Sequence, residues 1–377
     1  MQRVDILREV EIKTSARVMQ CRSLFDVPPA DVSAERWSFD LDLPEDWTIG
    51  VIVGPSGSGK STLAGELWGD HLCRGFDYPA DRAVVDAFPS GMGIKDVTNV
   101  LSSVGFSSPP AWLRPFHVLS TGQKFRVDVA RALSEAAGGL IVIDEFTSVV
   151  DRTVAQIGSA AVSKAVRRLP GQRFVAVTCH YDVIDWLDPD WVLEMPTGSL
   201  TRRSLQGRPP IDLDIYQADR SAWRIFAPHH YLSSDANKAA RFFVAEVGGQ
   251  PAALMAMLSF PHPKTPSWKI HRVVCLPDFQ GVGIGSRLQD LLSEAYAATG
   301  KYVGITTTHP GLIGSLGRSK VWICTCAPAV TRPNRNKGKR GRVVKSMRRT
   351  QAVNRWSATF RYVGPTDSEL ARKIGLI

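Results

Sequence analysis

The 377-residue sequence contains no apolar run close to the roughly 18 residues that a membrane-spanning helix requires. Its first residues alternate between charged and apolar types, which is not the pattern of a signal peptide. Cysteines are few, six in all, and they lack the spacing of a disulfide framework. Cys324 and Cys326 form a C-x-C pair without a second pair at zinc-site spacing, so we expect two small strand residues there. These absences predict a cytoplasmic protein with no membrane partner.

Acidic residues are absent from residues 295–366, although this segment holds 14 lysines and arginines. It therefore contributes +14 to a chain whose net charge is +10, and its densest part is residues 332–349. A cationic run is commonly a solvated surface or a loop, but one without acidic counterweight also neutralises phosphates. We expect nucleic acid as a partner, DNA rather than RNA. The candidate contacts are Arg332, Arg335, Lys337, Lys339, Arg340, Arg342, Lys345, Arg348 and Arg349.

A glycine-rich loop follows the first strongly apolar strand of the chain. The stretch DWTIGVIVGPSGSGKSTLAGELWG reads as strand, loop and helix, and it satisfies the pattern G-x-x-x-x-G-K-[ST]. Glycines let backbone N–H groups curl around phosphate oxygens, and the helix adds its positive N-terminal end. We expect Lys60 to reach the β- and γ-phosphates of ATP and Ser61 to ligate Mg²⁺. The candidate ATP-binding residues here are Gly54, Pro55, Ser56, Gly57, Ser58, Gly59, Lys60, Ser61 and Thr62.

Two later strands end at polar residues suited to a nucleotide site. The apolar stretch GGLIVIDEF ends near Asp144 and Glu145, and RFVAVTCH ends at His180. Because the carboxyl ends of parallel strands meet at one edge of a sheet, we expect these side chains beside the glycine loop. Asp144 would hold the Mg²⁺ shell, and Glu145 would orient or deprotonate the attacking water.

The order of these motifs resembles that of ABC-class ATPases. LSTGQ (119–123) is similar to the family signature L-S-G-G-Q, and it lies between the glycine loop and LIVIDE. SVVD (148–151) and then His180 follow, as the D-loop and switch histidine do in that family. The resemblance covers residues 54–180 and implies an α/β P-loop nucleotide-binding domain.

The same resemblance implies roles for particular residues. Ser120 and Gly122 would contact the γ-phosphate of ATP held by a second copy, with Gln123 and Asp151 also at the ATP site. Glu145 and His180 would be the catalytic residues. Two chains would form a homodimer around two ATPs, sandwiched head to tail.

The chain departs from the ABC pattern between the glycine loop and the signature. Residues 61–118 contain no glutamine, whereas the family has a Q-loop glutamine there. We expect a strand at RAVVDAF to place Asp86 at the Mg²⁺ shell instead. The segment is also short for a transporter, which favours the soluble branch that works on DNA, RNA or ribosomes. For adenine stacking, Phe25 is the candidate ahead of Trp37.

A second glycine loop occurs in DFQGVGIGSRL (278–288). A dinucleotide site is excluded because Ser286 replaces the final glycine of its fingerprint, and because KYVGITTTHP (301–310) ends without a carboxylate for the ribose. A strand leads into the loop and a clean helical pattern leads out. This arrangement predicts a pyrophosphate cradle.

QGVGIG satisfies the Q/R-x-x-G-x-G/A pattern of motif A in GNAT-family N-acetyltransferases. The resemblance covers about residues 210–365 and implies a mixed α+β fold, with a hairpin over 240–260 turning at Gly248 and Gly249. Backbone N–H groups of the loop would bind the pyrophosphate of acetyl-CoA or another acyl-CoA. Free backbone groups of the splayed incoming strand would pair with the pantetheine arm. The implied contacts are Cys275, Leu276, Gln280, Gly281, Val282, Gly283, Ile284, Gly285 and Ser286.

The tyrosine with which many family members protonate the leaving thiolate has no counterpart here. The stretch GLIGSLGRSKVW offers Ser315, and its glycines predict a poor helix. Candidate bases for an acceptor amine are His271, Glu246 and His309, and an ordinary surface or core role explains each equally well. Thioester aminolysis depends on proximity more than on a strong base, so acyl-CoA binding is better supported than transfer.

The length suits two domains. We expect an ABC ATPase domain at 1–205, a GNAT acetyltransferase-like domain at 206–365 that contains the basic segment 332–349, and a C-terminal tail at 366–377. The order resembles that of ABC ATPase–acetyltransferase fusions among phage and archaeal proteins. The leading hypothesis is an ATPase coupled to an acyl-CoA-dependent enzyme that modifies nucleic acid or a nucleoprotein. An ATP-dependent binding machine with a non-catalytic GNAT module is the alternative, and a transporter ATPase subunit fits less well.

Overall fold

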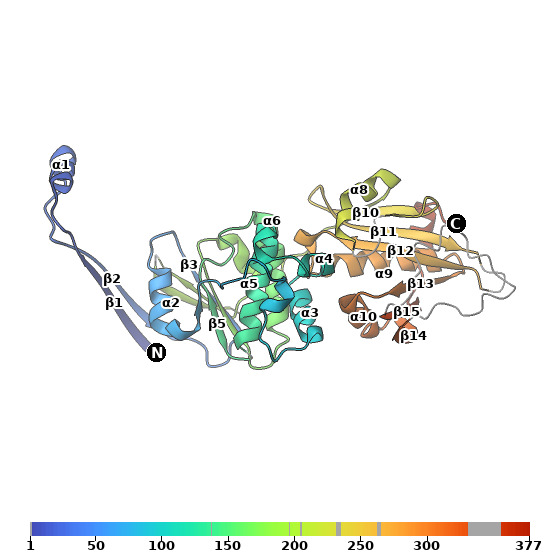
Figure 1. Ribbon diagram of the computed structural model, residues 1–377, viewed down its shortest axis with the longest axis horizontal. Coiled ribbons are helices and arrows are strands. Elements are labelled where there is room, and N and C mark those ends of the chain that lie inside the picture. The colour runs from blue at the N-terminus through green and yellow to red at the C-terminus, as the bar shows by residue number, and fades with distance from the viewer. Residues whose placement is uncertain are drawn as a thin grey trace.

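The computed structural model describes residues 2–377 except 137, 196, 204–205, 231–234, 262–264 and 331–355. Two sheet-based units lie side by side along the long axis, and a hairpin arm projects from the N-terminal one (Figure 1). All nine basic residues proposed as nucleic-acid contacts fall within 331–355 and so lie outside the described residues.

The arm consists of β1 (Gln2–Glu11) and β2 (Val32–Leu41), which pair antiparallel over their full length. At its inner end Phe39 and Leu41 are buried. At its outer end lies α1 (Ala16–Phe25), which has no buried residue (Figure 1). The arm therefore joins the core only through its base.

The N-terminal unit is built on a six-stranded sheet with the order β4-β5-β6-β3-β7-β8. All neighbouring pairs are parallel except the last, where β8 runs antiparallel to β7. This arrangement confirms the strands expected before the glycine loop, before Glu145 and before His180. The strands are β3 (Ile49–Val53), β4 (Leu72–Cys73), β5 (Leu140–Ile143), β6 (Arg173–Thr178), β7 (Trp191–Glu194) and β8 (Ser199–Arg202).

Helices cover both faces of this sheet. On one face α2 packs with the base of the arm, and on the other α3, α5 and α6 form the larger core. The helices are α2 (Lys60–Trp68), α3 (Ile94–Ser103), α4 (Pro109–Trp112), α5 (Thr121–Ala136), α6 (Arg152–Val166) and α7 (Ile184–Leu187).

The prediction of a strand at RAVVDAF is wrong. Val84–Ala87 form a short 3₁₀ turn in which the N–H of Asp86 donates to the carbonyl of Ala83. The N–H of Val84 donates to the carbonyl of Arg114, so the segment is held by the loop after α4 and not by a sheet. A short apolar segment forms a β-strand only where a neighbouring strand is available to pair with it.

The C-terminal unit is a seven-stranded sheet with the order β14-β15-β13-β12-β11-β10-β9. Only β12 and β13 are parallel; the other neighbours are antiparallel. Gly248 and Gly249 have φ of 56° and 77° at the turn between β10 and β11, which confirms the hairpin. The strands are β9 (Asp214–Ala218), β10 (Arg241–Val247), β11 (Gln250–Phe260), β12 (Ser267–Cys275), β13 (Tyr302–Thr307), β14 (Trp322–Val330) and β15 (Trp356–Tyr362).

The parallel pair β12 and β13 separates along its length. Ser267–Ile270 pair with Tyr302–Ile305, but the remainder of β12, up to Cys275, pairs with β11 alone. The glycine loop follows β12 and leads into α9 (Ile284–Ala297), which packs on β11, β12 and β13. The divergence opens a wedge whose wide end lies at this loop.

Two expectations for the C-terminal unit need correction. The glycine-rich segment after β13 does form a helix, α10 (Pro310–Gly317), because Pro310 stands in its first turn and His309 caps it. The last residues are not a separate tail: α12 (Ser368–Lys373) packs on α9 with Ala371 fully buried. Their apolar side chains belong to the core of the C-terminal unit.

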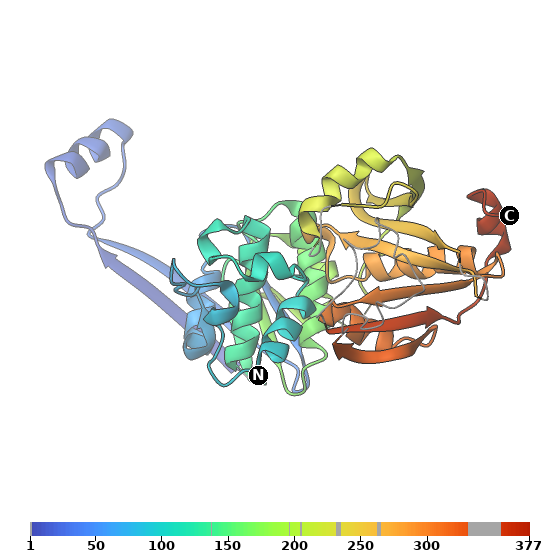
Figure 2. The ribbon, with the colours of Figure 1, turned by 45° about the vertical axis from the view of Figure 1, so that its right-hand side comes forward.

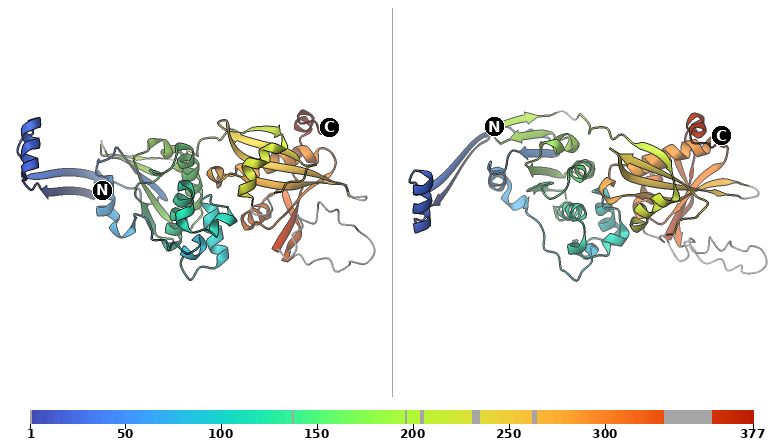
Figure 3. Two further views of the ribbon diagram at one scale, coloured as in Figure 1. Left: turned by 45° about the horizontal axis from the view of Figure 1, so that its top comes forward. Right: turned by 90° about the horizontal axis from the view of Figure 1, so that it is seen from above.

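The two units are joined by α6. One side of this helix packs in the N-terminal core, while Ile157, Ala160 and Ala161 belong to the core cluster of the C-terminal sheet. Figure 2 shows α6 bordering the orange segments that contain β12 and α9, and Figure 3 shows the same junction from two further sides. The apolar contact makes the junction part of the folded core.

Candidate functional site

The first glycine loop lies between β3 and α2. Gly57 and Gly59 have φ of 78° and 84°, in the left-handed region where only glycine is unstrained. This backbone turns the chain directly into α2, whose free N-terminal N–H groups favour an anion. The Nζ of Lys60 lies across the loop and donates to the carbonyl of Pro55 at 2.7 Å. The loop has the form of a phosphate cradle, and its residues fit ATP.

The predicted Mg²⁺ ligands meet. The Oγ of Ser61 donates to Oδ1 of Asp144 at 2.9 Å, and the N–H of Glu145 donates to the same oxygen at 2.9 Å. A hydroxyl beside a carboxylate is an oxygen donor set that suits Mg²⁺. Glu145 and Thr147 have φ of 51° and 66°, so the chain bends sharply after β5. The bend keeps Glu145 at the lip of the cavity around the glycine loop.

His180 reaches the same edge of the sheet from β6. Its Nδ1 lies 3.3 Å from the hydroxyl of Thr147, and its N–H donates to the hydroxyl of Thr178. Burial lowers the pKa of His180, the charge of Arg152 acts in the same direction, and Asp182 opposes both. The ring is therefore neutral at neutral pH.

A cavity of about 330 Å³ lies at the glycine loop and is lined by Ser61, Asp144 and Glu145 among others, but not by His180. Strand β2 contributes Trp37, whose indole lies against Gly59, so a Cβ placed there would come within 2.7 Å of the ring. Phe25, in contrast, is 74% exposed at the end of α1, at the tip of the arm. Preferring Phe25 as the aromatic neighbour of the nucleotide is therefore wrong, because β2 carries Trp37 to the loop. The lining residues are Glu35, Trp37, Ser56, Gly57, Gly59, Lys60, Ser61, Thr62, Asp144, Glu145, Ser148, Val177, Thr178 and Cys179.

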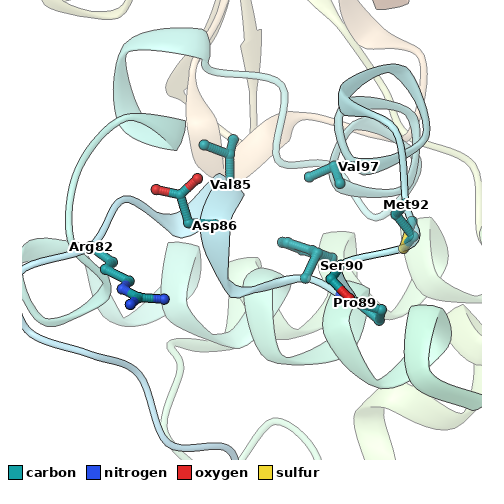
Figure 4. Close-up of a pocket in the computed structure, with 8 residues that line it drawn as sticks. Arg82, Val85, Asp86, Pro89, Ser90, Met92 and Val97 are labelled. Atoms are coloured by element: carbon teal, nitrogen blue, oxygen red, sulfur yellow. The ribbon is translucent and has the colours of Figure 1, made fainter.

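The structure does not bring Asp86 to the Mg²⁺ ligands. Asp86 lines a separate cavity of about 430 Å³, formed with Arg82, Val85 and residues that lead into α3 (Figure 4). This cavity shares no residue with the one around the glycine loop. The missing strand accounts for the difference, since a 3₁₀ turn leaves Asp86 away from the sheet edge.

The signature segment begins α5 with a reciprocal cap. The N–H of Ser120 donates to Oε1 of Gln123 at 3.1 Å, and the N–H of Gln123 donates to Oγ of Ser120 at 3.3 Å. Asp151 caps α6 in a similar way by accepting from the N–H of Val154. None of these residues lines the cavity around the chain's own glycine loop.

The second glycine loop lies at the wide end of the wedge between β12 and β13. Gly281 and Gly283 have φ of 91° and 98°, and Gly283 precedes the first residue of α9. The side chain of Gln280 links this loop to both units of the chain. Its Nε2 donates to the carbonyl of Cys275, in the C-terminal unit, at 2.8 Å, and its Oε1 accepts from the N–H of Ser107, in the N-terminal unit, at 2.7 Å. Left-handed glycines before a helix suit the pyrophosphate of an acyl-CoA.

Cys275 ends β12 and is partly buried. Its thiol lies 3.4 Å from the carbonyl of Phe279, and burial raises its pKa to about 12, with the charge of Arg126 opposing. A neutral thiol is a weak nucleophile, so Cys275 contributes its backbone and its volume to the wedge.

Each of the three candidate bases makes hydrogen bonds within the protein. Burial lowers the pKa of His271 to about 4, and its Nε2 accepts from the N–H of Asn237 at 3.0 Å. Glu246 accepts from the hydroxyl of Tyr216 at 2.6 Å. His309 caps α10 through Nδ1 and reaches the carbonyl of Ser107 through Nε2 at 3.2 Å. Their contacts fit structural roles.

Cys324 and Cys326 are exposed residues of β14 with free thiols. Among the residues that the structure describes, no group of three or more His, Cys, Asp or Glu side chains is placed to hold a metal ion. Across the same residues, no helix combines the length and apolar character needed to cross a membrane.

Residues 212–313 match the model of the acetyltransferase (GNAT) family. The match begins just before β9 and ends within α10, and so includes the hairpin, the diverging strands, the glycine loop and α9. The C-terminal unit is therefore a GNAT domain, as the QGVGIG stretch implied. No curated protein matches the chain significantly.

Solved structures similar to this chain include ATP-binding cassettes. A dimeric cassette in a post-hydrolysis state, bound to ADP and phosphate, is 18% identical to this chain, with a TM-score of 0.35. The match covers 46% of this chain and 93% of the cassette. An inward-facing ABC transporter of the metal-chelate type is 20% identical with a TM-score of 0.35, covering 48% and 86%. The protein cbiO1 from Clostridium perfringens, part of an ABC transporter complex, is 21% identical with a TM-score of 0.32, covering 42% and 77%.

Proposed function

We propose that this chain is an ATP-hydrolysing ABC-type ATPase coupled to an acyl-CoA-dependent GNAT-type N-acyltransferase, and that it modifies or processes nucleic acid or a nucleoprotein. One observation carries the proposal: a single chain holds two glycine loops of different design, each between a strand and a helix. The first adjoins the Ser61–Asp144 pair, and the second adjoins the wedge between β12 and β13.

In the first site, Lys60 and the loop N–H groups bind the β- and γ-phosphates of ATP, and Ser61 and Asp144 hold Mg²⁺. Bound Mg²⁺ supplies positive charge against the phosphate oxygens. Glu145 orients the attacking water, and neutral His180, held by Thr147, offers a polar group at the γ-phosphate end.

Two copies acting together account for the signature segment. Ser120, Gln123 and Asp151 are ordered by caps at helix starts but do not line the cavity of their own chain. A second copy placed head to tail would present them to the nucleotide, which makes ATP the link of a homodimer. This arrangement is part of the proposal.

Binding of acetyl-CoA tests the second site. Calorimetric titration of the full chain is expected to show one site per chain, and Gly283→Val is expected to weaken it at least about tenfold, because a side chain at φ of 98° distorts the cradle. Gly300→Val is the matched control, since Gly300 also has positive φ and open space but lies beyond the far end of α9. Absence of binding, or equal affinity in both variants, would contradict the proposal.

A second candidate function is an ATP-dependent nucleic-acid-binding machine whose GNAT domain only recognises a partner. The hydrogen bonds of His271 and His309 favour it, because Nε2 of His271 accepts from the N–H of Asn237 and Nδ1 of His309 accepts from the N–H of Leu312. Acetyl-CoA that binds but is never consumed would support this function over acyl transfer.

A further inference from the structure

The loop that would cradle the acyl-CoA lies in the junction between the two units. Two of its carbonyl groups are bound by basic side chains: that of Gly281 accepts from Nζ of Lys164, in α6 of the ATPase domain, at 3.4 Å, and that of Val282 accepts from Arg208, in the segment between β8 and β9, at 2.8 Å. The opposite face of the loop adjoins the wedge between β12 and β13. The loop conformation is therefore set by the ATPase domain on one side and by its own sheet on the other.

Arg126 of α5 is the central contact. Its side chain is fully buried; Nη1 donates to the carbonyl of Pro277 at 2.5 Å and Nη2 donates to the carbonyl of Asp278 at 3.0 Å. Burial lowers the pKa of Arg126 to about 10, and Asp278 opposes this, so the side chain stays charged at neutral pH. A buried cation that binds two loop carbonyls fixes the loop tightly, because moving the loop would leave the charge unpartnered.

A second contact spans the wide end of the wedge. The N–H of Ser107 donates to Gln280, which follows β12, and the carbonyl of Ser107 meets His309, which follows β13. The backbone before Ser107 approaches so closely that a Cβ on Gly105 would lie 2.6 Å from the carbonyl oxygen of Gln280. The segment between α3 and α4 therefore bridges the two strand ends.

Gln280 uses this bridge to occupy a backbone group of the proposed acyl-CoA site. Oε1 of Gln280 accepts from the N–H of Ser107, while Nε2 donates to the carbonyl of Cys275, at the end of β12 that pairs with β11 and not with β13. That carbonyl is one that a pantetheine amide would need. Displacement of Ser107 would remove one of the two hydrogen bonds that hold the side chain of Gln280, and would so favour release of the carbonyl of Cys275.

The same helix connects these contacts to the signature segment. Ser120 and Gln123 form the cap at the start of α5, and Arg126 lies six residues after Ser120, about 9 Å along the helix axis. Because Arg126 lies in the helix that Ser120 caps, a displacement of Ser120 by a phosphate would also move Arg126 and the two loop carbonyls that it binds.

We propose that Arg126 is a positioning residue that couples the ATP sandwich to the acyl-CoA loop, so that ATP binding tightens the binding of acetyl-CoA. This inference rests on the proposed function, since it requires both ligands to bind. Coupling between two sites is reciprocal: acetyl-CoA must tighten ATP binding by the same factor.

The test is a pair of calorimetric titrations in the full-length Glu145→Gln chain, which retains unhydrolysed ATP. Acetyl-CoA is titrated with and without saturating ATP and Mg²⁺, and the affinity is expected to rise about fivefold or more with ATP. In Arg126→Gln the two ligands are expected to bind separately, with a ratio of affinities below about twofold. Arg131→Gln is the matched control, since Arg131 lies on the same helix but contacts Glu135 and the carbonyl of Asp77.

Thermal unfolding shows whether Arg126→Gln folds. If it does not, Gln280→Ala is used in its place, because that substitution removes the side chain that links Ser107 to Cys275. Coupling that is unchanged in the folded variant, or an acetyl-CoA affinity that ATP leaves unchanged or weakens, would overturn the inference while leaving the proposed function intact. Absence of acetyl-CoA binding under all conditions would instead remove the proposed function, and the inference with it.

Discussion

At the scale of single residues, the two adjacent carboxylates after β5, Asp144 and Glu145, have different surroundings and therefore different proposed roles. Asp144 is held by the hydroxyl of Ser61 and the N–H of Glu145, while the left-handed backbone at Glu145 turns its own side chain to the lip of the cavity. The sequence placed both acids at a sheet edge because an apolar strand ended there. It ranked Trp37 behind Phe25, because an arm strand gives no local signal of the loop it reaches.

Replacing Glu145 with Gln is expected to keep ATP binding within about threefold and to lower hydrolysis at least about a hundredfold, because the amide cannot take a proton from water. Phosphate release measures hydrolysis, and size-exclusion chromatography with light scattering is expected to show an ATP-dependent dimer in the variant. Hydrolysis at the wild-type rate would contradict the role given to Glu145.

His271 makes the stability of the chain depend on pH. Burial lowers its pKa to about 4, and the charge of Arg272 acts in the same direction. Above pH 6.5 the ring is neutral in both states; between pH 6.5 and 4 the unfolded chain binds a proton that the folded chain does not. Stability is therefore expected to fall as the pH falls through this window.

The melting temperature measures this effect, with His271→Gln as the comparison because glutamine keeps an acceptor for the N–H of Asn237. The variant is expected to lose less melting temperature between pH 7 and pH 5 than the wild type. Equal losses in the two proteins would show that His271 does not contribute.

At the scale of elements, the sequence predicted those that carry a long pattern or a sharp boundary. The glycine loops, the strands that feed them, α5, α9 and the hairpin at Gly248 and Gly249 are present where the pattern indicated. It failed at short segments, whose structure is set by neighbours far away in the chain. Val84–Ala87 is a turn because Arg114 holds it, and α10 forms because His309 and Pro310 start it.

The junction gives a sharp prediction for one glycine. A Cβ on Gly281 would lie 2.7 Å from the Cβ of Ala161 and 2.8 Å from the Cα of Gly105, whereas one on Gly283 would meet nothing within 4 Å. Both residues have positive φ, so Gly281→Ala and Gly283→Ala share a strain of about 1 kcal/mol or more. Gly281→Ala adds an overpacking cost of about 1–3 kcal/mol.

Chemical denaturation is therefore expected to give a larger loss of unfolding free energy for Gly281→Ala than for Gly283→Ala. Equal losses would indicate that the two units do not meet at Gly105 and Gly281 as described.

At the scale of the whole molecule, the chain joins two binding loops through a shared core. Sequence could predict two domains because each loop resembled a separate family. It could not predict that α5 and α6 contact the second loop, since Arg126 and Lys164 are ordinary members of a helix pattern until the fold places Pro277 and Gly281 against them. The packing of α12 on α9 was likewise hidden, because a short terminal helix carries little periodicity.

The uneven charge predicts salt-dependent binding to nucleic acid. Replacing the nine cations of residues 332–349 with glutamine is expected to weaken DNA binding at least about tenfold at low salt and to flatten its salt dependence, because fewer counterions are released. Fluorescence anisotropy with a labelled duplex measures both. Wild-type protein without salt-dependent binding to DNA or RNA would remove nucleic acid as the partner.

The most direct test of the central claim is mass spectrometry of nucleosides and proteins after incubation with ATP and isotope-labelled acetyl-CoA. The proposed function predicts a labelled acyl group on a nucleoside or a protein side chain, formed only when both ligands are present and lost in Glu145→Gln. Unlabelled nucleosides and proteins, in a preparation shown to bind acetyl-CoA and hydrolyse ATP, would contradict acyl transfer.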